Sequence, residues 1–125
     1  MYNANTAYNV YNENNISIES STKLIEMLYE GVLRFNAQAK KAIKDGDIEK
    51  RVYWTNRSIS IITELIQSLD MEQEGTMAEY LKGLYSHEIV LLTEAGAKNN
   101  VDKLDEVTNV FRELLTAWRE MTHVD

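Results

Sequence analysis

Apolar residues recur at steps of three and four along most of the chain, which is the spacing of an amphipathic helix. This pattern predicts four helices, at about 21–44, 48–71, 77–98 and 101–121. The cleanest apolar stripe lies in the last segment and consists of Leu104, Val107, Phe111, Leu114, Trp118 and Met121. The stripes in the other three segments are Ile25, Leu28, Val32, Phe35, Ala39 and Ile43; Ile48, Val52, Thr55, Ile59, Ile62, Ile66 and Leu69; and Met77, Leu81, Leu84, Leu91 and Ala95.

Short polar segments separate the predicted helices. Gly46 can adopt the left-handed conformation that ends a helix, and Asp47 can cap the next one. Asn99 and Asn100 suit the last turn, because Asn tolerates left-handed angles and also caps. Connections this short make neighbouring helices antiparallel. The sequence therefore predicts an all-α fold, an antiparallel up-and-down four-helix bundle over residues 20–125.

Side-chain caps are also expected at the starts of two other helices. Ser20 or Ser21 can cap the first helix with its hydroxyl group. A turn at 72–75 is followed by Thr76-Met77-Ala78-Glu79, which fits the capping box. These caps would fix where the first and third helices begin.

The first nineteen residues differ from the rest of the chain. Six of the first fifteen are Asn and three are Tyr, without a helical period. Asn favours turns, because its amide competes with the backbone for hydrogen bonds. A frayed terminus is one interpretation, but three tyrosines with Ile16 and Ile18 carry much apolar area. We expect residues 1–19 to form an irregular, partly ordered N-terminal arm that docks on another surface.

Composition excludes several classes of function. The chain has 125 residues, enough for one domain, and a net charge of −7, which argues against binding to nucleic acid or to an anionic membrane surface. It has no Cys, so it forms no disulfides, and this suits a reducing cytoplasm. We see no secretory signal, and the longest apolar run, Ile89-Val90-Leu91-Leu92, is far too short to cross a membrane.

A search for catalytic or metal-binding residues leaves one weak alternative. A di-iron bundle needs two Glu-x-x-His pairs, and only Glu120 and His123 have that spacing. His87 could carry a phosphoryl group in a phosphorelay bundle, but Glu88 follows it where such chemistry wants a cation. We therefore predict no enzyme activity, no metal and no cofactor, with the phosphorelay as an alternative.

Apolar residues are left over once each helix has one core stripe. Some of them can simply widen the stripes, but together they exceed what four helices should bury. A large exposed apolar surface usually marks a partner site, and a groove between two helices could hold an amphipathic helix. The residues left over are Leu24, Met27, Leu33, Trp54, Ile61, Leu65, Tyr80, Val90, Leu92, Val110 and Leu115.

Several segments resemble one known family, the flagellar secretion chaperones of the FliS family. Residues 20–31, with the sequence SSTKLIEMLYEG, resemble the signature at the start of the family's first helix. The resemblance continues in order through ITEL at 62–65, LD at 69–70, EG at 74–75, YLKGLY at 80–85 and AWR at 117–119. One departure is Ser21, where the family commonly has Pro; Pro there only presets the backbone angle of the first turn.

The resemblance implies a cytoplasmic export chaperone. It would bind the disordered C-terminal segment of new flagellin, prevent premature polymerisation, and deliver flagellin to the flagellar export apparatus. A co-chaperone or assembly regulator on another face, or an unrelated helical adaptor in place of a chaperone, stays open. The resemblance implies a flagellin-binding surface that includes Tyr8, Leu24, Met27, Leu28 and Tyr29. The left-over apolar residues of the second helix add Ile61 and Leu65 to it. Leu28 and Tyr29 could equally belong to the core.

Overall fold

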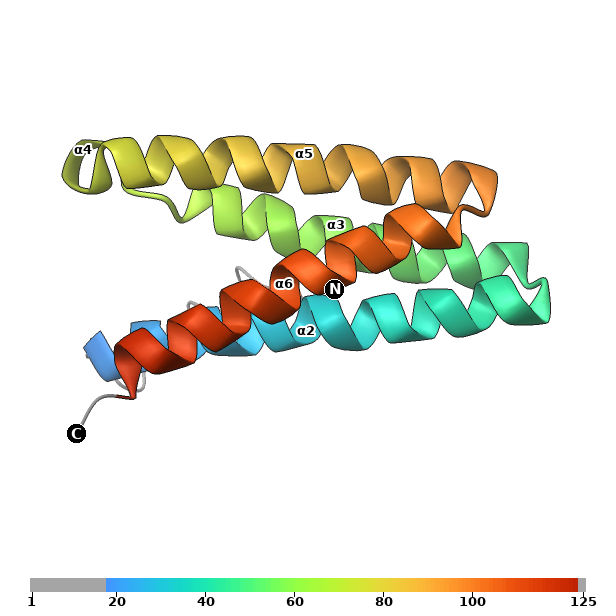
Figure 1. The fold of residues 1–125 in the computed structure, drawn as a ribbon, viewed down its shortest axis with the longest axis horizontal. Helices are drawn as coiled ribbons and strands as arrows, with labels where there is room; N and C mark the ends of the chain where they lie inside the picture. The colour runs from blue at the N-terminus through green and yellow to red at the C-terminus, as the bar shows by residue number, and fades with distance from the viewer. Residues whose placement is uncertain (1–17, 124–125) are drawn as a thin grey trace.

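The computed structural model describes residues 18–123, which form four long helices and one short one. The long helices run antiparallel to their neighbours, as Figure 1 shows, and this confirms the predicted all-α, antiparallel architecture. The predicted N-terminal arm lies outside the described residues, apart from its last two positions. The five helices are α2 (Ile18–Asp45), α3 (Ile48–Gln67), α4 (Met71–Glu74), α5 (Thr76–Lys98) and α6 (Val101–Thr122).

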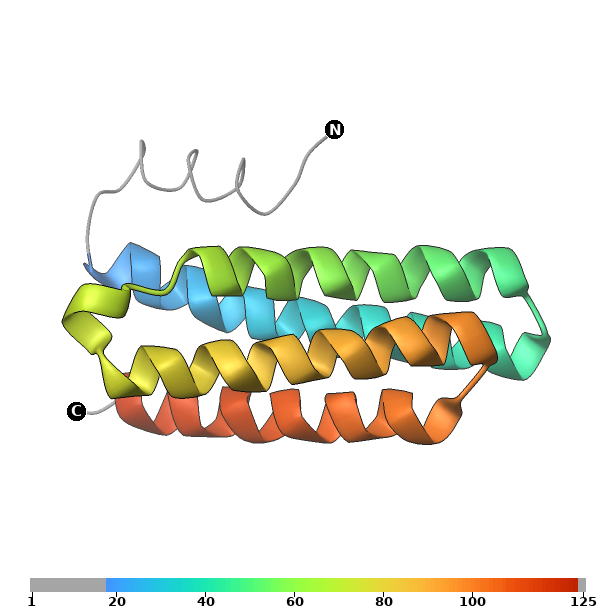
Figure 2. The same cartoon turned by 90° about the horizontal axis from the view of Figure 1, so that it is seen from above.

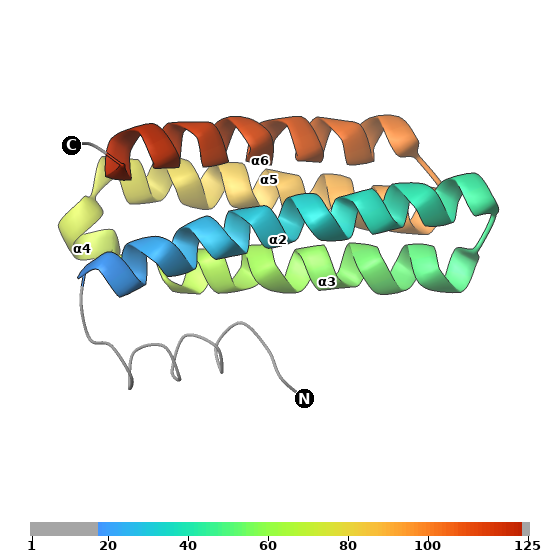
Figure 3. The same ribbon diagram turned by 90° about the horizontal axis from the view of Figure 1, so that it is seen from below.

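The long helices form a closed ring. Both α2 and α5 pack against α3 and against α6, whereas the short α4 packs only against α5. Figures 2 and 3 show one end of the bundle with the α2–α3 and α5–α6 turns, and the opposite end with the start of α2, the end of α6, and α4. We call this second end the α4 end. None of these helices is long and apolar enough to cross a membrane.

The two turns at the other end agree with the sequence prediction. Gly46 has φ of +69°, and the Asp47 carboxylate accepts a hydrogen bond from the Lys50 amide at 3.0 Å. Asn99 has φ of +57°, which is the left-handed conformation that Asn tolerates. Asn100 caps α6 by accepting from the Lys103 amide at 3.2 Å. Each turn therefore uses one residue to end a helix and the next to start another.

The connection between α3 and α5 differs from the prediction. We expected the second helix to reach Met71, but α3 ends at Gln67. The amide of Ser68 donates to the Glu64 carbonyl at 3.0 Å and the amide of Leu69 donates to the Ile66 carbonyl at 3.2 Å, which closes the last turn. The chain then forms α4 as a separate helix, and the continuous helical pattern of the sequence hid this break.

The predicted capping box at Thr76 is wrong. Thr76 is already the first residue of α5, and Gly75 precedes it with φ of +51° and no side-chain cap. Reciprocal capping occurs instead around α4, where Asp70 accepts from the amides of Glu72 and Gln73 at 3.1 Å. The Glu74 carboxylate accepts from the Asp70 amide at 3.3 Å. The predicted caps at Ser20 and Ser21 are also wrong, because α2 begins earlier, at Ile18.

The core agrees only in part with the predicted stripes. Ile48, Val52, Met77 and Met121 were assigned to the core, but their side chains are exposed. Three of them lie in the first or last turn of a helix, where the ring of neighbouring helices ends. In α3 the buried face keeps the predicted Thr55 and Ile62 but is rotated toward Ser58, Ile61 and Leu65.

Small residues let α3 approach its neighbours closely. A Cβ atom on Gly96 would lie 2.6 Å from the Thr55 hydroxyl, and one on Gly31 would lie 2.7 Å from the Ile61 side chain. The two glycines therefore leave room for α3, although Gly costs a helix about 1 kcal/mol relative to Ala. The surrounding buried core also includes Val32, Ala39, Leu92, Ala95, Leu104, Val107 and Phe111.

Candidate functional site: an apolar pocket at the α4 end

A pocket of about 200 Å³ opens at the α4 end of the bundle. Every helix contributes to it, and most of its side chains are apolar or aromatic. A concave apolar site with a few polar groups is the usual form of a binding site for another molecule. Its lining consists of Ser21, Ile25, Tyr29, Leu65, Ser68, Leu69, Glu74, Leu81, Tyr85 and Trp118.

Two tyrosines from opposite helices meet in this lining. The hydroxyl oxygens of Tyr29 on α2 and Tyr85 on α5 are 2.6 Å apart, and both side chains are buried. Burial raises the pKa of both phenols above the ordinary value, so both hydroxyls stay protonated and one donates to the other. The ring of Phe111 stacks on Tyr85 and meets Tyr29 edge-on. The pair thus links α2 to α5 across the ring of helices.

We expect Tyr85→Phe to lower the free energy of unfolding by about 1–3 kcal/mol, the cost of leaving a buried hydroxyl without its partner. The substitution leaves the Tyr29 hydroxyl buried without its partner. Urea denaturation followed by circular dichroism would measure the change. Tyr80→Phe is the matched control, because Tyr80 is exposed. Equal stability of the two variants would contradict a contribution from the tyrosine pair.

A polar cluster fixes the end of α6 against the start of α2 beside the pocket. The Trp118 indole donates to the Thr22 carbonyl at 3.0 Å. The buried Glu26 carboxylate accepts from Arg119 at 3.2 Å and lies 3.0 Å from the ring nitrogen of His123. Burial alone would raise the pKa of Glu26, but the hydrogen bonds from Arg119 and His123 hold it below its ordinary value. Glu26 is therefore an ionised anchor for α6.

The two histidines considered at the sequence level take no part in a metal cluster. His123 pairs with Glu26 on α2, and His87 is exposed on α5. Within residues 18–123, no group of three or more His, Cys, Asp or Glu side chains is arranged to hold a metal ion.

The structure places the predicted flagellin-binding residues mostly inside the bundle. Leu24 and Ile61 are buried, Leu28 is half-buried, and Met27 is 43% exposed. Tyr29 and Leu65 line the pocket, and Tyr8 lies outside the described residues. The expectation that Leu24, Ile61 and Leu65 belong to left-over surface is therefore wrong for this bundle. The rotated face of α3 buries Ile61 and Leu65, while Leu24 is buried on α2.

The same correction applies to other left-over apolar residues. Leu92 and Leu115 are fully or almost fully buried, and Leu33, Trp54 and Val110 are half-buried against the core. Tyr80 and Val90 are exposed, as predicted. Most of the apparent surplus thus widens the core.

The pocket contains residues that sequence reasoning had given to the core alone. Ile25, Leu69, Leu81 and Trp118 belong to the predicted stripes, but they lie near helix ends, where the core opens to solvent. The signal that could have identified them is the set of segments that resemble the FliS family, because 20–31, 69–70, 80–85 and 117–119 contain these four residues. A stripe residue near the end of a helix packs on only one side and leaves the other side for a partner.

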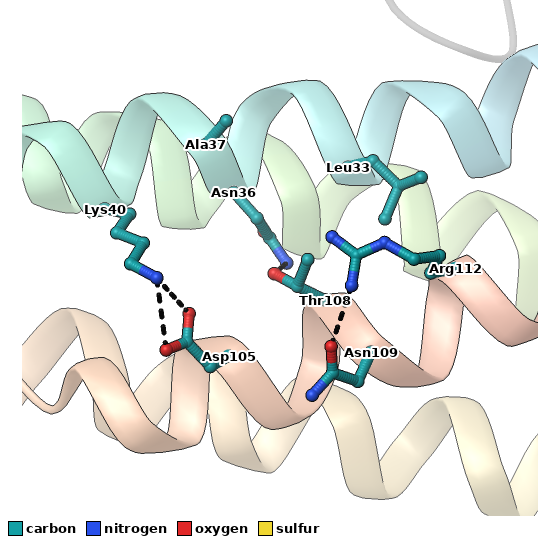
Figure 4. A pocket seen from close by; sticks show the side chains of 8 residues that line it. All are labelled: Leu33, Asn36, Ala37, Lys40, Asp105, Thr108, Asn109 and Arg112. Atoms are coloured by element: carbon teal, nitrogen blue, oxygen red, sulfur yellow. Dashed lines mark hydrogen bonds and ion pairs between the residues drawn. The ribbon is translucent and has the colours of Figure 1, made fainter.

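A second hollow, of about 370 Å³, lies between α2 and α6 and is polar. Figure 4 shows that its side chains bind one another: Lys40 reaches Asp105 at 3.0 Å, and the Asn36 amide donates to the Thr108 hydroxyl at 3.1 Å. The Ser58 hydroxyl on α3 donates to the side-chain oxygen Oδ1 of Asn36 at 2.6 Å. This polar layer joins three helices, so we assign it to the pairing of helices.

The fold and the pocket define a class of protein. An antiparallel helical bundle with an apolar pocket built from all its helices is suited to holding a segment of another polypeptide. The model of the family described as "Flagellar protein FliS" matches residues 3–125. The chain therefore belongs to the FliS family of flagellar secretion chaperones.

Similar proteins from several bacteria carry the same description. The flagellar secretion chaperone FliS of Campylobacter jejuni is 56% identical over 117 residues, which cover 94% of this chain and 91% of that protein. The corresponding protein of Vibrio cholerae is 30% identical over 109 residues, covering 87% of this chain and 80% of that protein. The corresponding protein of Bacillus subtilis is 27% identical over 113 residues, covering 90% of this chain and 84% of that protein. The family is one of chaperones, so the chain is not an enzyme, and His87 needs no phosphorelay role.

Proposed function

We propose that this chain binds the C-terminal segment of flagellin in the cytoplasm, prevents its premature polymerisation, and delivers it to the flagellar export apparatus. Membership of the FliS family supports the chaperone role. The observation that carries the binding role is the apolar pocket at the α4 end, which every helix lines.

The flagellin segment enters the pocket over Leu69 and Leu81, and it has to wrap around α2 to reach Leu28 and then Met27, since Met27 lies on the side of α2 away from Ile25 and Tyr29. Exposure of Met27 at 43% makes it accessible without any change in the bundle. Tyr29 and Leu65 contact the segment from the pocket wall. The remaining residues proposed for this surface are Tyr8, Leu24 and Ile61, of which the last two support it from beneath.

Binding is coupled to folding of the flagellin segment. A disordered segment that folds on its partner loses several kcal/mol to ordering, and it recovers this by burying a large surface. One pocket of about 200 Å³ holds only a small part of such a segment. The rest of the segment lies along the outer helix faces, so the pocket sets the register.

A pocket-blocking variant tests this proposal. Ser21 is exposed at the pocket rim, so Ser21→Trp should obstruct the entrance without disturbing the core. We expect wild type to form a one-to-one complex with a peptide of the flagellin C-terminal segment in isothermal titration. Ser21→Trp should weaken binding at least about tenfold, a loss of about 1.4 kcal/mol. Met27→Asp should also weaken it and keep the helical content.

The matched control is Ser86→Trp, at an exposed serine of α5 outside the pocket. This variant should bind within about twofold of wild type. No binding of wild type at micromolar concentration would refute the flagellin proposal. Equal binding by Ser21→Trp and Ser86→Trp would leave flagellin binding intact and refute its location.

We further propose that the loaded chaperone contacts the export apparatus, and that a co-chaperone or assembly regulator can bind a face that flagellin leaves free. This follows from the chaperone role, since an export chaperone has to bind flagellin and contact the export apparatus at the same time. The exposed apolar residues outside the pocket support such a second contact.

A further inference from the structure

The α3–α5 connection is longer than its function as a turn requires. The α2–α3 and α5–α6 turns each use two residues, whereas residues 68–75 join α3 to α5 and include the helix α4. No residue of α4 is buried, and α4 packs on α5 alone. Figures 1 and 2 show it projecting beyond the ends of the long helices. The segment therefore adds little to the core.

The same segment is nevertheless fixed in one shape. Asp70 accepts hydrogen bonds from two amides of α4, and Glu74 accepts one from the Asp70 amide. Ordering the backbone of a residue costs about 1–2 kcal/mol. Leu69 packs against the core, but α4 itself is capped at this cost without burying a residue, and so it presents a defined surface to solvent.

Large apolar side chains are exposed on this surface. Met71 is 42% exposed, Met77 is 59% exposed and Tyr80 is 64% exposed. Methionine side chains are flexible and polarisable, so they fit irregular apolar partners and are common on binding surfaces. Tyr at an interface supplies a rigid apolar ring with a polar tip. None of the three lines the pocket at the α4 end.

The charge around these side chains is mainly negative, with the exposed Lys82 at one edge. Residues 70–81 contain four acidic residues, at Asp70, Glu72, Glu74 and Glu79, and no Lys or Arg. Complementary potentials steer partners together and suppress those with the wrong charge. An apolar surface surrounded by these acidic residues fits a partner whose apolar side chains are flanked by Lys or Arg.

We propose that this part of the molecule docks a second protein through a helical segment with an apolar face flanked by Lys or Arg. We call the site the α4 surface, defined as Asp70, Met71, Glu72, Met77, Glu79 and Tyr80. It goes beyond the proposed flagellin binding, because it shares no residue with the pocket lining. Flagellin can occupy the pocket while the second protein occupies the α4 surface.

A direct test uses the full chain labelled with ¹³C at the methionine methyl groups. The probe is an 18-residue amphipathic peptide with Leu on one face and Lys on the other, and the comparison peptide has Glu in place of Lys. We expect the Leu/Lys peptide to shift the methyl signals of Met71 and Met77 in a saturable way, without shifting that of Met27. The Leu/Glu peptide should shift none. Unmoved signals of Met71 and Met77 would overturn the proposal.

Paired charge reversals separate local recognition from attraction by net charge. Glu72→Lys with Glu79→Lys should weaken binding of the Leu/Lys peptide at least about tenfold. Glu106→Lys with Glu113→Lys changes the net charge equally at two exposed positions of α6, and should leave affinity within about twofold. Equal weakening by both pairs would overturn the proposal, because attraction by net charge alone would then explain binding.

A third variant separates the α4 surface from the flagellin site. Met77→Ser with Tyr80→Ser should abolish binding of the Leu/Lys peptide while helical content and affinity for the flagellin peptide stay unchanged. Loss of both affinities, or displacement of the flagellin peptide by the Leu/Lys peptide, would make this surface part of the flagellin site and overturn the proposal. If wild type fails to bind flagellin but binds the Leu/Lys peptide at Met71 and Met77, only the flagellin proposal fails.

Discussion

Phe111→Ala is expected to lower the free energy of unfolding by about 3–5 kcal/mol, as buried Phe→Ala substitutions usually do. The ring is fully buried on α6 and lies between Tyr29 and Tyr85, with ring centroids 5.8 and 6.1 Å away. Removing the ring loses the free energy gained by its transfer from water into the core. It also leaves a cavity in the layer that joins α2, α5 and α6. The variant should also lose affinity for the flagellin peptide, because the same tyrosines form the pocket wall.

Urea denaturation of wild type and variant would measure the change in free energy. The matched control is Phe35→Ala, the same substitution at the other Phe of the chain. Phe35 is half-buried, and the guanidinium groups of Arg34 and Arg57 lie 5.3 and 5.0 Å from its ring centroid. Its loss should cost clearly less than the loss of Phe111. Equal costs would mean that Phe111 does not occupy the centre of the core.

Glu88→Gln is expected to raise the free energy of unfolding at neutral pH, because wild type has to ionise a buried carboxylate there and glutamine does not. The Glu88 side chain is 1% exposed, and its Oε1 atom has no hydrogen-bond partner among the described residues. Burial raises the pKa of Glu88, the nearby charge of Glu106 raises it further, and His87 opposes both. Glutamine has almost the same shape and never ionises.

The pH dependence distinguishes this explanation from a simple change in packing. Because the folded pKa of Glu88 lies above the unfolded value of about 4.3, its contribution to stability is complete below about pH 4.3. That contribution is lost as pH rises through the raised folded pKa. Wild type and Glu88→Gln should therefore have similar stability near pH 4 and diverge toward pH 7. Urea titrations at both pH values would measure the divergence.

Glu113→Gln controls for the loss of one negative charge, since Glu113 is exposed on α6. It should alter stability by less than about 0.5 kcal/mol at either pH, as surface substitutions usually do. A stability difference between Glu88→Gln and wild type that is the same at both pH values would refute ionisation as its cause.

The helices could be predicted from the sequence because periodicity and turn chemistry agree. Gly46, Asp47, Asn99 and Asn100 act in the structure as their chemistry predicts. The sequence did not reveal the break before α4, because apolar residues continue at helical spacing through Leu69. The hydrogen bonds that cap α4 come from Asp70 and Glu74, which in the sequence resemble ordinary surface residues. The sequence spacing does not show which of two adjacent faces turns inward.

The α3 helix illustrates this last difficulty. Its predicted stripe included Ile48 and Val52, which are exposed, and left out Ser58, Ile61 and Leu65, which are buried beside the predicted Thr55 and Ile62. Ile61 is buried because Gly31 leaves room for it on α2, and Ser58 is buried because the Asn36 side chain accepts its hydrogen bond. Both reasons depend on other helices, so periodicity within α3 could not provide them.

The candidate site could be predicted less well than the fold. The matched segments contain Tyr29 at 20–31, Leu81 and Tyr85 at 80–85, and Trp118 at 117–119, and all four line the pocket, but the segments themselves did not show that these residues meet. Leu81, Tyr85 and Trp118 lie far from α2 in sequence, and they meet Tyr29 only through the arrangement of all four helices. A single sequence identifies the segments that carry a site more readily than the way in which they come together.

The unequal lengths of the three connections have a kinetic consequence. The two-residue turns make α2 with α3, and α5 with α6, into helical hairpins of mostly local contacts, which form fast. We therefore expect docking of the two hairpins across the longer α3–α5 connection to be the later event. The pocket draws Tyr29 and Leu65 from the first hairpin, and Tyr85 and Trp118 from the second. A half-folded chain therefore has no pocket, and only a chaperone that has finished folding can take up its cargo.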